Sequence, residues 1–131
     1  MFLDTSGLLC FLDRRDRRHK EAIQFYRNVH ARLTSNYVLA EYVALAHVRG
    51  LPRQQSLDFS KAILADVEVE IFWVDEALHR EAVDLLLARA DKTYSLCDAV
   101  SFVLMRERGT LEALTTDKHF EQEGFVRLLK T

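Results

Sequence analysis

Three carboxylates in this chain each stand alone in a mainly apolar segment that holds no other Asp, Glu, Lys or Arg. They are Asp4 in residues 1–12, Glu41 in residues 33–48 and Asp98 in residues 93–105. Burying an unpaired carboxylate costs several kcal/mol, so such groups are normally paired, used as helix caps or bound to a cation. A fourth carboxylate, Asp117, directly follows a predicted strand. One shared cation site would explain all four.

The residues around these carboxylates favour a hard divalent cation. Mg²⁺ takes oxygen ligands, uses one or two carboxylates directly and keeps several waters. Hydroxyl groups that can orient carboxylate oxygens lie nearby in the sequence, at Thr5, Ser6, Ser95, Thr115 and Thr116. A zinc site is disfavoured, because the histidines at positions 19, 30, 47, 79 and 119 show no ligand spacing and neither cysteine joins them.

A structural role is the alternative for each aspartate. Asp4 and Asp117 each precede a predicted helix, where a carboxylate can cap backbone amides. Asp98 follows Ser95 by three residues, which is the spacing of a capping box. A structural role is harder to assign to Glu41, because it lies within a predicted helix and has no basic residue within four positions.

Short strands and amphipathic helices alternate along the chain and predict an α/β fold with a mainly parallel sheet. The carboxyl ends of parallel strands share one edge, so Asp4 and Asp117 would meet there. Strands are expected at residues 2–3, around Leu33, and at 67–74, 111–115 and 125–129. Helices are expected at residues 5–12, 21–32, 36–48, 52–65, 76–90, 95–108 and 118–123.

The composition describes one folded domain over residues 1–131. Apolar residues make up 49% and charged residues 29%, which excludes disorder and allows a core inside an ordinary surface. The net charge of −2 argues against a basic nucleic-acid binder. Without the four carboxylates, however, 18 basic residues face 16 acidic ones. The negative net charge of the whole chain therefore does not exclude a polyanionic partner.

The cysteines and the apolar segments predict a cytoplasmic protein. Cys10 and Cys97 lack the spacing of a redox or metal motif, and we interpret them as reduced, buried thiols. The apolar start of the chain carries Asp4 and precedes its basic residues, the reverse of a signal peptide. No apolar run reaches the roughly 18 residues of a membrane span, so no membrane partner is expected.

Four ordered motifs resemble those of PIN-domain ribonucleases, and their spacing resembles the VapC-type toxin branch over essentially the whole chain. The motifs are Met1–Ser6, Ser35–Glu41, Ser95–Ala99 and Thr115–Phe120. The resemblance implies a three-layer sandwich with a mainly parallel sheet of about five strands flanked by helices. It also implies cleavage of RNA that depends on Mg²⁺ or Mn²⁺.

The same resemblance implies which residues act and which partners bind. Asp4, Glu41, Asp98 and Asp117 would be the catalytic and metal-binding acids, supported by Thr5, Ser95 and Thr116. A VapB-like antitoxin and a homodimer, or a dimer of toxin–antitoxin pairs, are also implied. This chain departs from many relatives by carrying His119 in place of an acid, and Asp91 is expected to be a surface residue rather than its substitute.

The basic segment Asp13–Lys20 is either a solvated surface or a phosphate-binding rim, because Arg and Lys bind nucleic-acid backbones without regard to sequence. Arg14, Arg15, Arg17 and Arg18 are its candidate RNA contacts. Tyr37, Tyr42 and Tyr94 are expected in the core or an interface rather than stacked on bases, and Phe25, Tyr26 and Trp73 in the core. The amphipathic helices 21–32 and 56–65 could bind the antitoxin or form a dimer.

Other functions remain as alternatives at this point. A haloacid-dehalogenase-like phosphatase would need an aspartate where Ser6 stands, and a response-regulator receiver would need a paired acidic cluster that the chain lacks. A PIN-fold nuclease for RNA processing, outside any toxin–antitoxin system, is one further alternative. A non-catalytic PIN-fold binding module is another, although the presence of all four acids argues against it.

Overall fold

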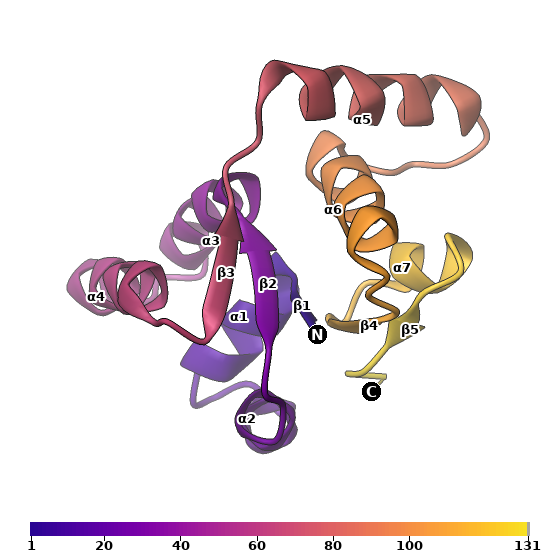
Figure 1. The fold of residues 1–131 in the computed structure, drawn as a ribbon. Helices are drawn as coiled ribbons and strands as arrows, with labels where there is room; N and C mark the ends of the chain where they lie inside the picture. The colour runs from indigo at the N-terminus through magenta and orange to yellow at the C-terminus, as the bar shows by residue number, and fades with distance from the viewer. Residues whose placement is uncertain (131) are drawn as a thin grey trace.

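The computed structural model describes residues 1–130 as a five-stranded sheet flanked by helices (Figure 1). The strands are β1 (Phe2–Leu3), β2 (Arg32–Ser35), β3 (Val69–Phe72), β4 (Glu112–Leu114) and β5 (Val126–Arg127). The helices are α1 (Thr5–Leu12), α2 (His19–Arg27), α3 (Asn36–Val48), α4 (Arg53–Ala65), α5 (Glu76–Ala88), α6 (Leu96–Arg108) and α7 (Lys118–Gln122).

All neighbouring strands are parallel, in the order β3-β2-β1-β4-β5, and β1 lies at the centre. Phe2 pairs with Leu33 on one side and Ala113 on the other. Because parallel strands end at the same edge, the segments after β1 and β4 emerge side by side. Asp4 follows β1 directly, and Asp117 lies three residues beyond β4. The fold class expected from the sequence is thus confirmed.

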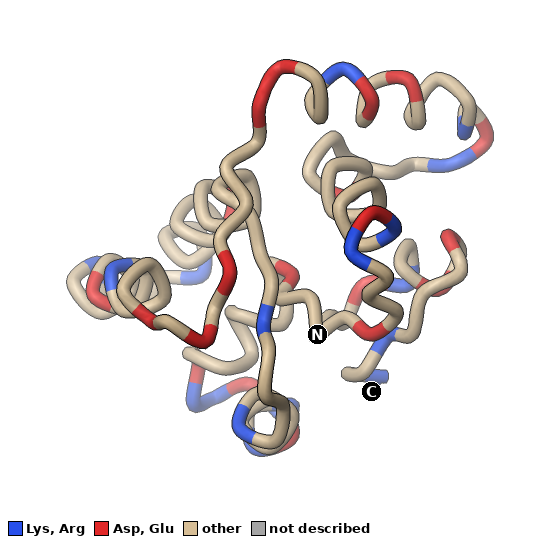
Figure 2. Tube along the Cα trace, viewed as in Figure 1, with Lys and Arg blue, Asp and Glu red and all other residues tan. Residues whose placement is uncertain are grey.

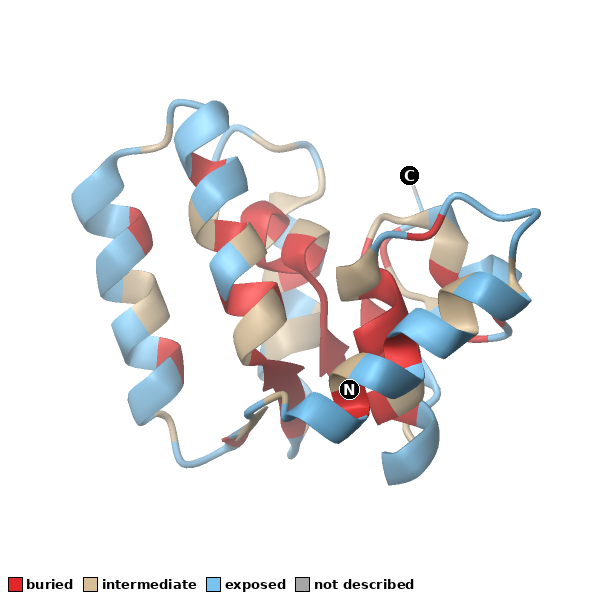
Figure 3. Ribbon diagram, turned by 90° about the horizontal axis from the view of Figure 1, so that it is seen from above, coloured by how far each residue is buried: buried red, intermediate tan, exposed pale blue. Residues whose placement is uncertain are grey.

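The core lies around the short central strands, and the outer turns of the helices are exposed (Figure 3). Phe2, Leu8, Phe102 and Leu114 are fully buried. Burying a side chain of this size contributes about 1.5–3 kcal/mol. Strands of two or three residues are therefore held in place mainly by the side chains packed on them.

Gly7 lets α1 approach the sheet closely. A Cβ at this position would lie 1.9 Å from the carbonyl oxygen of Leu114 at the end of β4. No side chain fits in that space, so the start of α1 rests directly on the β4 backbone. This contact places Asp4 next to the segment that follows β4.

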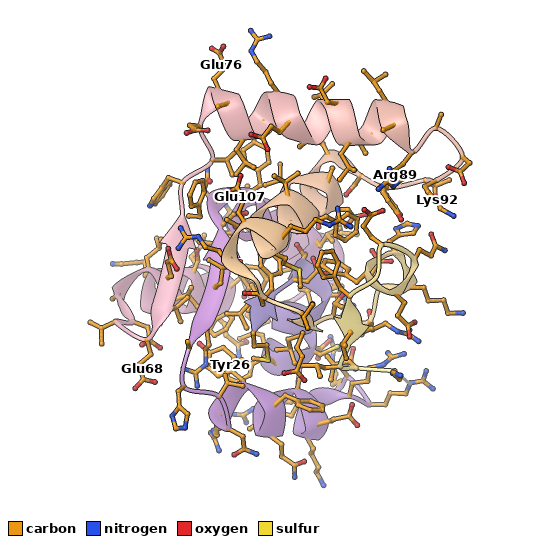
Figure 4. The ribbon with its side chains drawn as sticks, turned by 45° about the vertical axis from the view of Figure 1, so that its right-hand side comes forward. Tyr26, Glu68, Glu76, Arg89, Lys92 and Glu107 are labelled. Carbon is orange, nitrogen blue, oxygen red and sulfur yellow. The ribbon has the colours of Figure 1, made fainter. Side chains whose placement is uncertain are left out.

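Helices α5 and α6 form a hairpin that carries its own small apolar cluster (Figure 1). Leu78 and Ala82 of α5 pack against Ala99 and Val100 of α6. Glu76, at the start of α5, points outward, and Arg89 follows its other end (Figure 4). Within residues 1–130, no helix is both long and apolar enough to cross a membrane.

Two sequence predictions about local structure are wrong. The helix expected at residues 21–32 is α2 and ends at Arg27, while Arg32 begins β2. The Arg32 guanidinium lies 4.2 Å from the ring centroid of Tyr26 and pairs with Glu68, a tertiary arrangement that helical periodicity does not reveal. Trp73 is 63% exposed instead of in the core, because β3 is an edge strand that ends at Phe72.

The predictions for the other aromatic residues hold. Tyr42 and Tyr94 are buried in the core, and Phe25 and Tyr26 pack against it. The Tyr37 hydroxyl is hydrogen-bonded to Nδ1 of His79 on α5, which joins α3 to the hairpin.

Candidate active site

A cleft of about 410 Å³ at the carboxyl edge of the sheet contains all four carboxylates. Each comes from a different element: Asp4 from the end of β1, Glu41 from α3, Asp98 from α6 and Asp117 from the start of α7. Thr5 and Ser6 also line the cleft. The tertiary structure thus brings together residues that lie up to 113 positions apart in the sequence.

Asp4 is held by hydroxyl groups and does not cap α1. Its Oδ2 accepts hydrogen bonds from Thr115 Oγ1 at 2.7 Å and from Ser6 Oγ at 3.0 Å. Burial raises the pKa of Asp4 to about 7, with a further increase from the charge of Asp98, although the two hydroxyls oppose this shift. The capping role considered for Asp4 is therefore wrong, and its burial has no compensating cation among residues 1–130.

Asp98 and Asp117 do act as caps, as the sequence suggested. Asp98 forms a capping box with Ser95: Oδ2 of Asp98 accepts from the Ser95 amide, and Oγ of Ser95 accepts from the Asp98 amide. Oδ1 of Asp117 accepts from the amide of His119. Burial also raises the pKa of Asp98, and the charge of Asp117 adds to the increase. One oxygen of each carboxylate accepts the capping hydrogen bond, Oδ2 in Asp98 and Oδ1 in Asp117. The second oxygen of each carboxylate accepts no capping hydrogen bond.

Glu41 is half-buried at mid-helix and lines the same cleft. Within residues 1–130, no hydrogen bond or ion pair engages its carboxylate. A carboxylate directed into a cleft without a protein partner is free to interact with a ligand or with water.

The hydroxyl groups that support the acids differ in part from those expected. Ser6 and Thr115 contact Asp4, and Oγ1 of Thr115 also accepts from the Asp117 amide at 3.0 Å. Thr116 contributes its amide, which donates to Ser6 Oγ, instead of its hydroxyl. Oγ1 of Thr5 is buried and has no hydrogen-bond partner in the described part of the chain.

Two residues close to these acids had not been predicted as site residues. Arg49 lines the rim of the cleft, with Nη1 at 3.4 Å from Asp16 and 3.9 Å from Asp13. His119 lies between two acids, with Nδ1 at 3.3 Å from Asp98 Oδ2 and 3.3 Å from Asp117 Oδ1. The sequence carries no signal for Arg49, whereas it marks His119 only as standing where many relatives carry an acid. Asp91 is exposed and paired with Lys92, as the sequence predicted.

A second, larger hollow lies at the opposite edge of the sheet and lacks such chemistry. It measures about 690 Å³ and is lined by residues that include Arg32 and Arg108. Both arginines are paired there, with Glu68 at 3.1 Å and with Glu70 at 2.7 Å. Size alone therefore does not mark a candidate active site, and the group of carboxylates does.

The donor set at the carboxyl edge fits a divalent cation. Asp98, Asp117 and His119 each offer a ligand atom within 4.8 Å of the others. The unpartnered Thr5 hydroxyl and the free Glu41 carboxylate add oxygen donors beside them. Hard divalent ions bind such oxygen-rich sets.

Comparisons with known proteins identify the family of this chain. The sequence model of the PIN domain matches residues 1–125. This chain belongs to the PIN-domain family. It is 30% identical over 129 residues to the 23S rRNA-specific endonuclease VapC20 from two strains of Mycobacterium tuberculosis, covering 98% of this chain and 97% of the relative.

The structural comparison leads to the same branch of the family. The crystal structure of M. tuberculosis VapC20, described as a sarcin–ricin loop cleaving toxin, superimposes with a TM-score of 0.88 at 30% identity. The superposition covers 95% of each chain. The chain is thus a homologue of the VapC-type endonucleases, and the phosphatase, receiver and non-catalytic alternatives are not favoured.

Proposed function

We propose that this chain is a metal-dependent endoribonuclease toxin. The observation that carries the proposal is the convergence of Asp4, Glu41, Asp98 and Asp117 in one cleft, where burial raises the pKa of Asp4 and neither Asp4 nor Glu41 has an ion-pair partner within residues 1–130. The likeness to VapC20 over nearly the whole chain supports RNA as the substrate.

Asp4, Asp98 and Asp117 would hold Mg²⁺ or Mn²⁺ in this proposal. When bound, the ion supplies a lowered pKa for water and positive charge against the scissile phosphate. Glu41 either binds the ion or orients the attacking water. Ser6 and Thr115 hold the carboxylate of Asp4 in position. Attack by water on phosphorus breaks the bond to the 3′ oxygen and leaves a 5′-phosphate and a 3′-hydroxyl. The ribose 2′-hydroxyl takes no part.

The rim beside the cleft would bind the RNA backbone. Arg14, Arg15 and Arg17 are exposed on the connection between α1 and α2, whereas Arg18 is half-buried. Figure 2 shows the Lys and Arg positions along the chain in blue. Arg49 joins this connection to the cleft through its pairing with Asp13 and Asp16. Positive charge that continues from the acids along the surface suits a phosphate chain.

A VapB-like antitoxin and a homodimer complete the proposal. Apolar side chains suited to a partner helix are exposed at the cleft, at Leu45 and Val48 of α3. Leu57 and Leu64 of the neighbouring helix α4 are exposed as well. We place the protein in the cytoplasm, where RNA is present and where the free thiols of Cys10 and Cys97 stay reduced.

The test is cleavage of an RNA that contains the 23S sarcin–ricin loop, the target named for VapC20. Purified protein is expected to cut this RNA with Mg²⁺ or Mn²⁺ and to be inactive with a chelator. Induced expression is expected to arrest growth, and co-expression of the adjacent small gene to relieve the arrest. Cleavage that persists in the chelator would contradict the proposal, and cleavage without growth arrest would favour an RNA-processing role.

A further inference from the structure

His119 places a ring nitrogen among the acids of the cleft. Its Nδ1 lies 3.3 Å from Asp98 Oδ2 and 3.3 Å from Asp117 Oδ1. These three residues form the only group of His, Cys, Asp and Glu side chains within residues 1–130 whose ligand atoms are close enough to share an ion. The ligand atoms of the imidazole and the two carboxylates are thus close enough together to share one ion.

Contacts on two sides hold the ring in this orientation. Nε2 lies 3.1 Å from Thr93 Oγ1, and the ring meets Tyr94 edge-on with centroids 5.3 Å apart. The Tyr94 hydroxyl donates to the buried carboxylate of Glu123, which fixes the tyrosine in turn. When Nε2–H donates to Thr93, Nδ1 presents its lone pair toward the two carboxylates. Outer partners of this kind fix which nitrogen a histidine offers to a metal.

The Nδ1 lone pair of His119 and the two carboxylates that it faces are all electron-rich. A cation bound between the nitrogen and the carboxylates stabilises this arrangement. Mg²⁺ takes oxygen ligands and keeps its waters, whereas transition-metal ions also accept imidazole nitrogen. A nitrogen donor in place of an oxygen donor therefore favours a transition-metal ion over Mg²⁺.

We propose that Nδ1 of His119 is a metal ligand and shifts the site from Mg²⁺ toward transition-metal ions such as Mn²⁺, with Thr93 as the residue that positions the ring. This inference rests on the proposed metal-dependent function, since it requires an ion at the acid cluster. Direct binding measurements separate the two proposals.

The test measures Mn²⁺ binding to the full chain by electron paramagnetic resonance, with Mg²⁺ as competitor. The preference for Mn²⁺ over Mg²⁺ is expected to fall at least about tenfold in His119→Asp, which replaces nitrogen by oxygen. Pulsed spectra of wild-type protein should show coupling of Mn²⁺ to a directly bound nitrogen, and this coupling should vanish in the variant. His119→Gln, which also lacks the ring nitrogen, provides the same test if His119→Asp does not fold.

The control is His47→Gln, because His47 is exposed on α3 and lies outside the cleft. It should leave both the preference and the nitrogen coupling unchanged. Thr93→Val should weaken Mn²⁺ binding several-fold, and Thr93→Ser should restore it.

One set of results would overturn the inference about His119, and another would overturn the proposed function. Wild-type protein that binds Mn²⁺ without nitrogen coupling, or an unchanged metal preference in His119→Asp, would show that Nδ1–H only donates to the carboxylates, and the inference would fail while the metal site stands. Wild-type protein that binds neither ion would instead contradict the proposed function.

Discussion

Two regions of the molecule bury carboxylates, and the pKa of the buried acid shifts in opposite directions in the two regions. Glu123, at the end of α7, accepts hydrogen bonds from Arg89, Arg106 and Tyr94. Burial alone would raise the pKa of Glu123, but these hydrogen bonds hold it below its usual range. In the cleft, burial dominates, and the pKa of Asp4 rises to about 7.

We interpret this as the difference between a structural carboxylate and a carboxylate of the proposed metal site. The side chain of Glu123 is 3% exposed and has protein cations beside it, so it ties α7 to α6 and to the loop after α5. Asp4 is equally buried but has only hydroxyl partners among residues 1–130. A buried acid with arginine partners therefore stabilises the fold, while one without them marks a place for a ligand of positive charge.

The largest effect expected from this comparison is the loss of cleavage when a cleft acid is neutralised. Asp4→Asn and Asp98→Asn should each lower the rate of metal-dependent RNA cleavage by at least roughly 1000-fold, because each removes charge that holds the ion. Circular dichroism should show that both variants remain folded. Full activity in both would mean that the acid cluster is not the active site.

Neutralising the other buried carboxylate should instead destabilise the fold. Glu123→Gln leaves Arg89 and Arg106 without their charged partner and should lower the free energy of unfolding by about 2–3 kcal/mol. Urea denaturation measures the change. The matched control is Glu76→Gln, since Glu76 pairs with Arg80 at 2.9 Å on the exposed side of α5 and should contribute less than about 0.5 kcal/mol. Equal effects of the two changes would remove the contrast between the regions.

The pH dependence of stability should carry opposite signs in the two regions. The folded-state pKa of Asp4, about 7, lies above its ordinary value of 3.8, so folded protein binds the extra proton between these values. In metal-free protein, this contribution to stability is present below about pH 4 and is lost as the pH rises through 7. The lowered pKa of Glu123 acts the other way, and its contribution is lost only as the pH falls below about 4.5.

Thermal unfolding at two pH values tests this sign. In the presence of a chelator, Tm should be about 5 °C higher at pH 5 than at pH 8. Asp4→Asn should reduce this difference, because the amide does not titrate, and should raise Tm at pH 8. A wild-type Tm that increases from pH 5 to pH 8 without metal would contradict the assignment.

The smallest effect is expected at the rim, where charges are exposed. Reversing Arg14, Arg15 and Arg17 to Glu should weaken RNA binding and flatten its dependence on salt. The slope of the logarithm of the binding constant against the logarithm of the salt concentration should change by about 0.7 for each phosphate that the variant no longer neutralises. Filter binding over a range of salt concentrations gives both quantities. Arg27→Glu, at the exposed end of α2, is the control. If the three reversals leave binding unchanged, the rim is only a solvated surface.

Much of the fold was predictable because local signals agree with it. The run Phe2–Leu3 before Asp4, the capping box at Ser95 and the end of the following helix at Arg108 all appear as expected. The predictions failed where long-range contacts decide the structure. Helical periodicity continues beyond Arg27, yet α2 ends there and Arg32 enters the sheet. Trp73 follows the alternation of a buried strand, but the edge position of β3 leaves it exposed.

The sequence by itself determined that Asp4, Glu41 and Asp98 stand in surroundings that disfavour them, since isolation in apolar segments is a local property. It also determined that Asp98 and Asp117 can cap helices, because capping spans only two or three residues. Only the tertiary structure decided which groups surround the acids. Ser6 and Thr115 meet across 109 positions, and His119 meets Asp98 across 21. Such contacts follow from the order of the strands and the angle of each helix, which no spacing in the chain reveals.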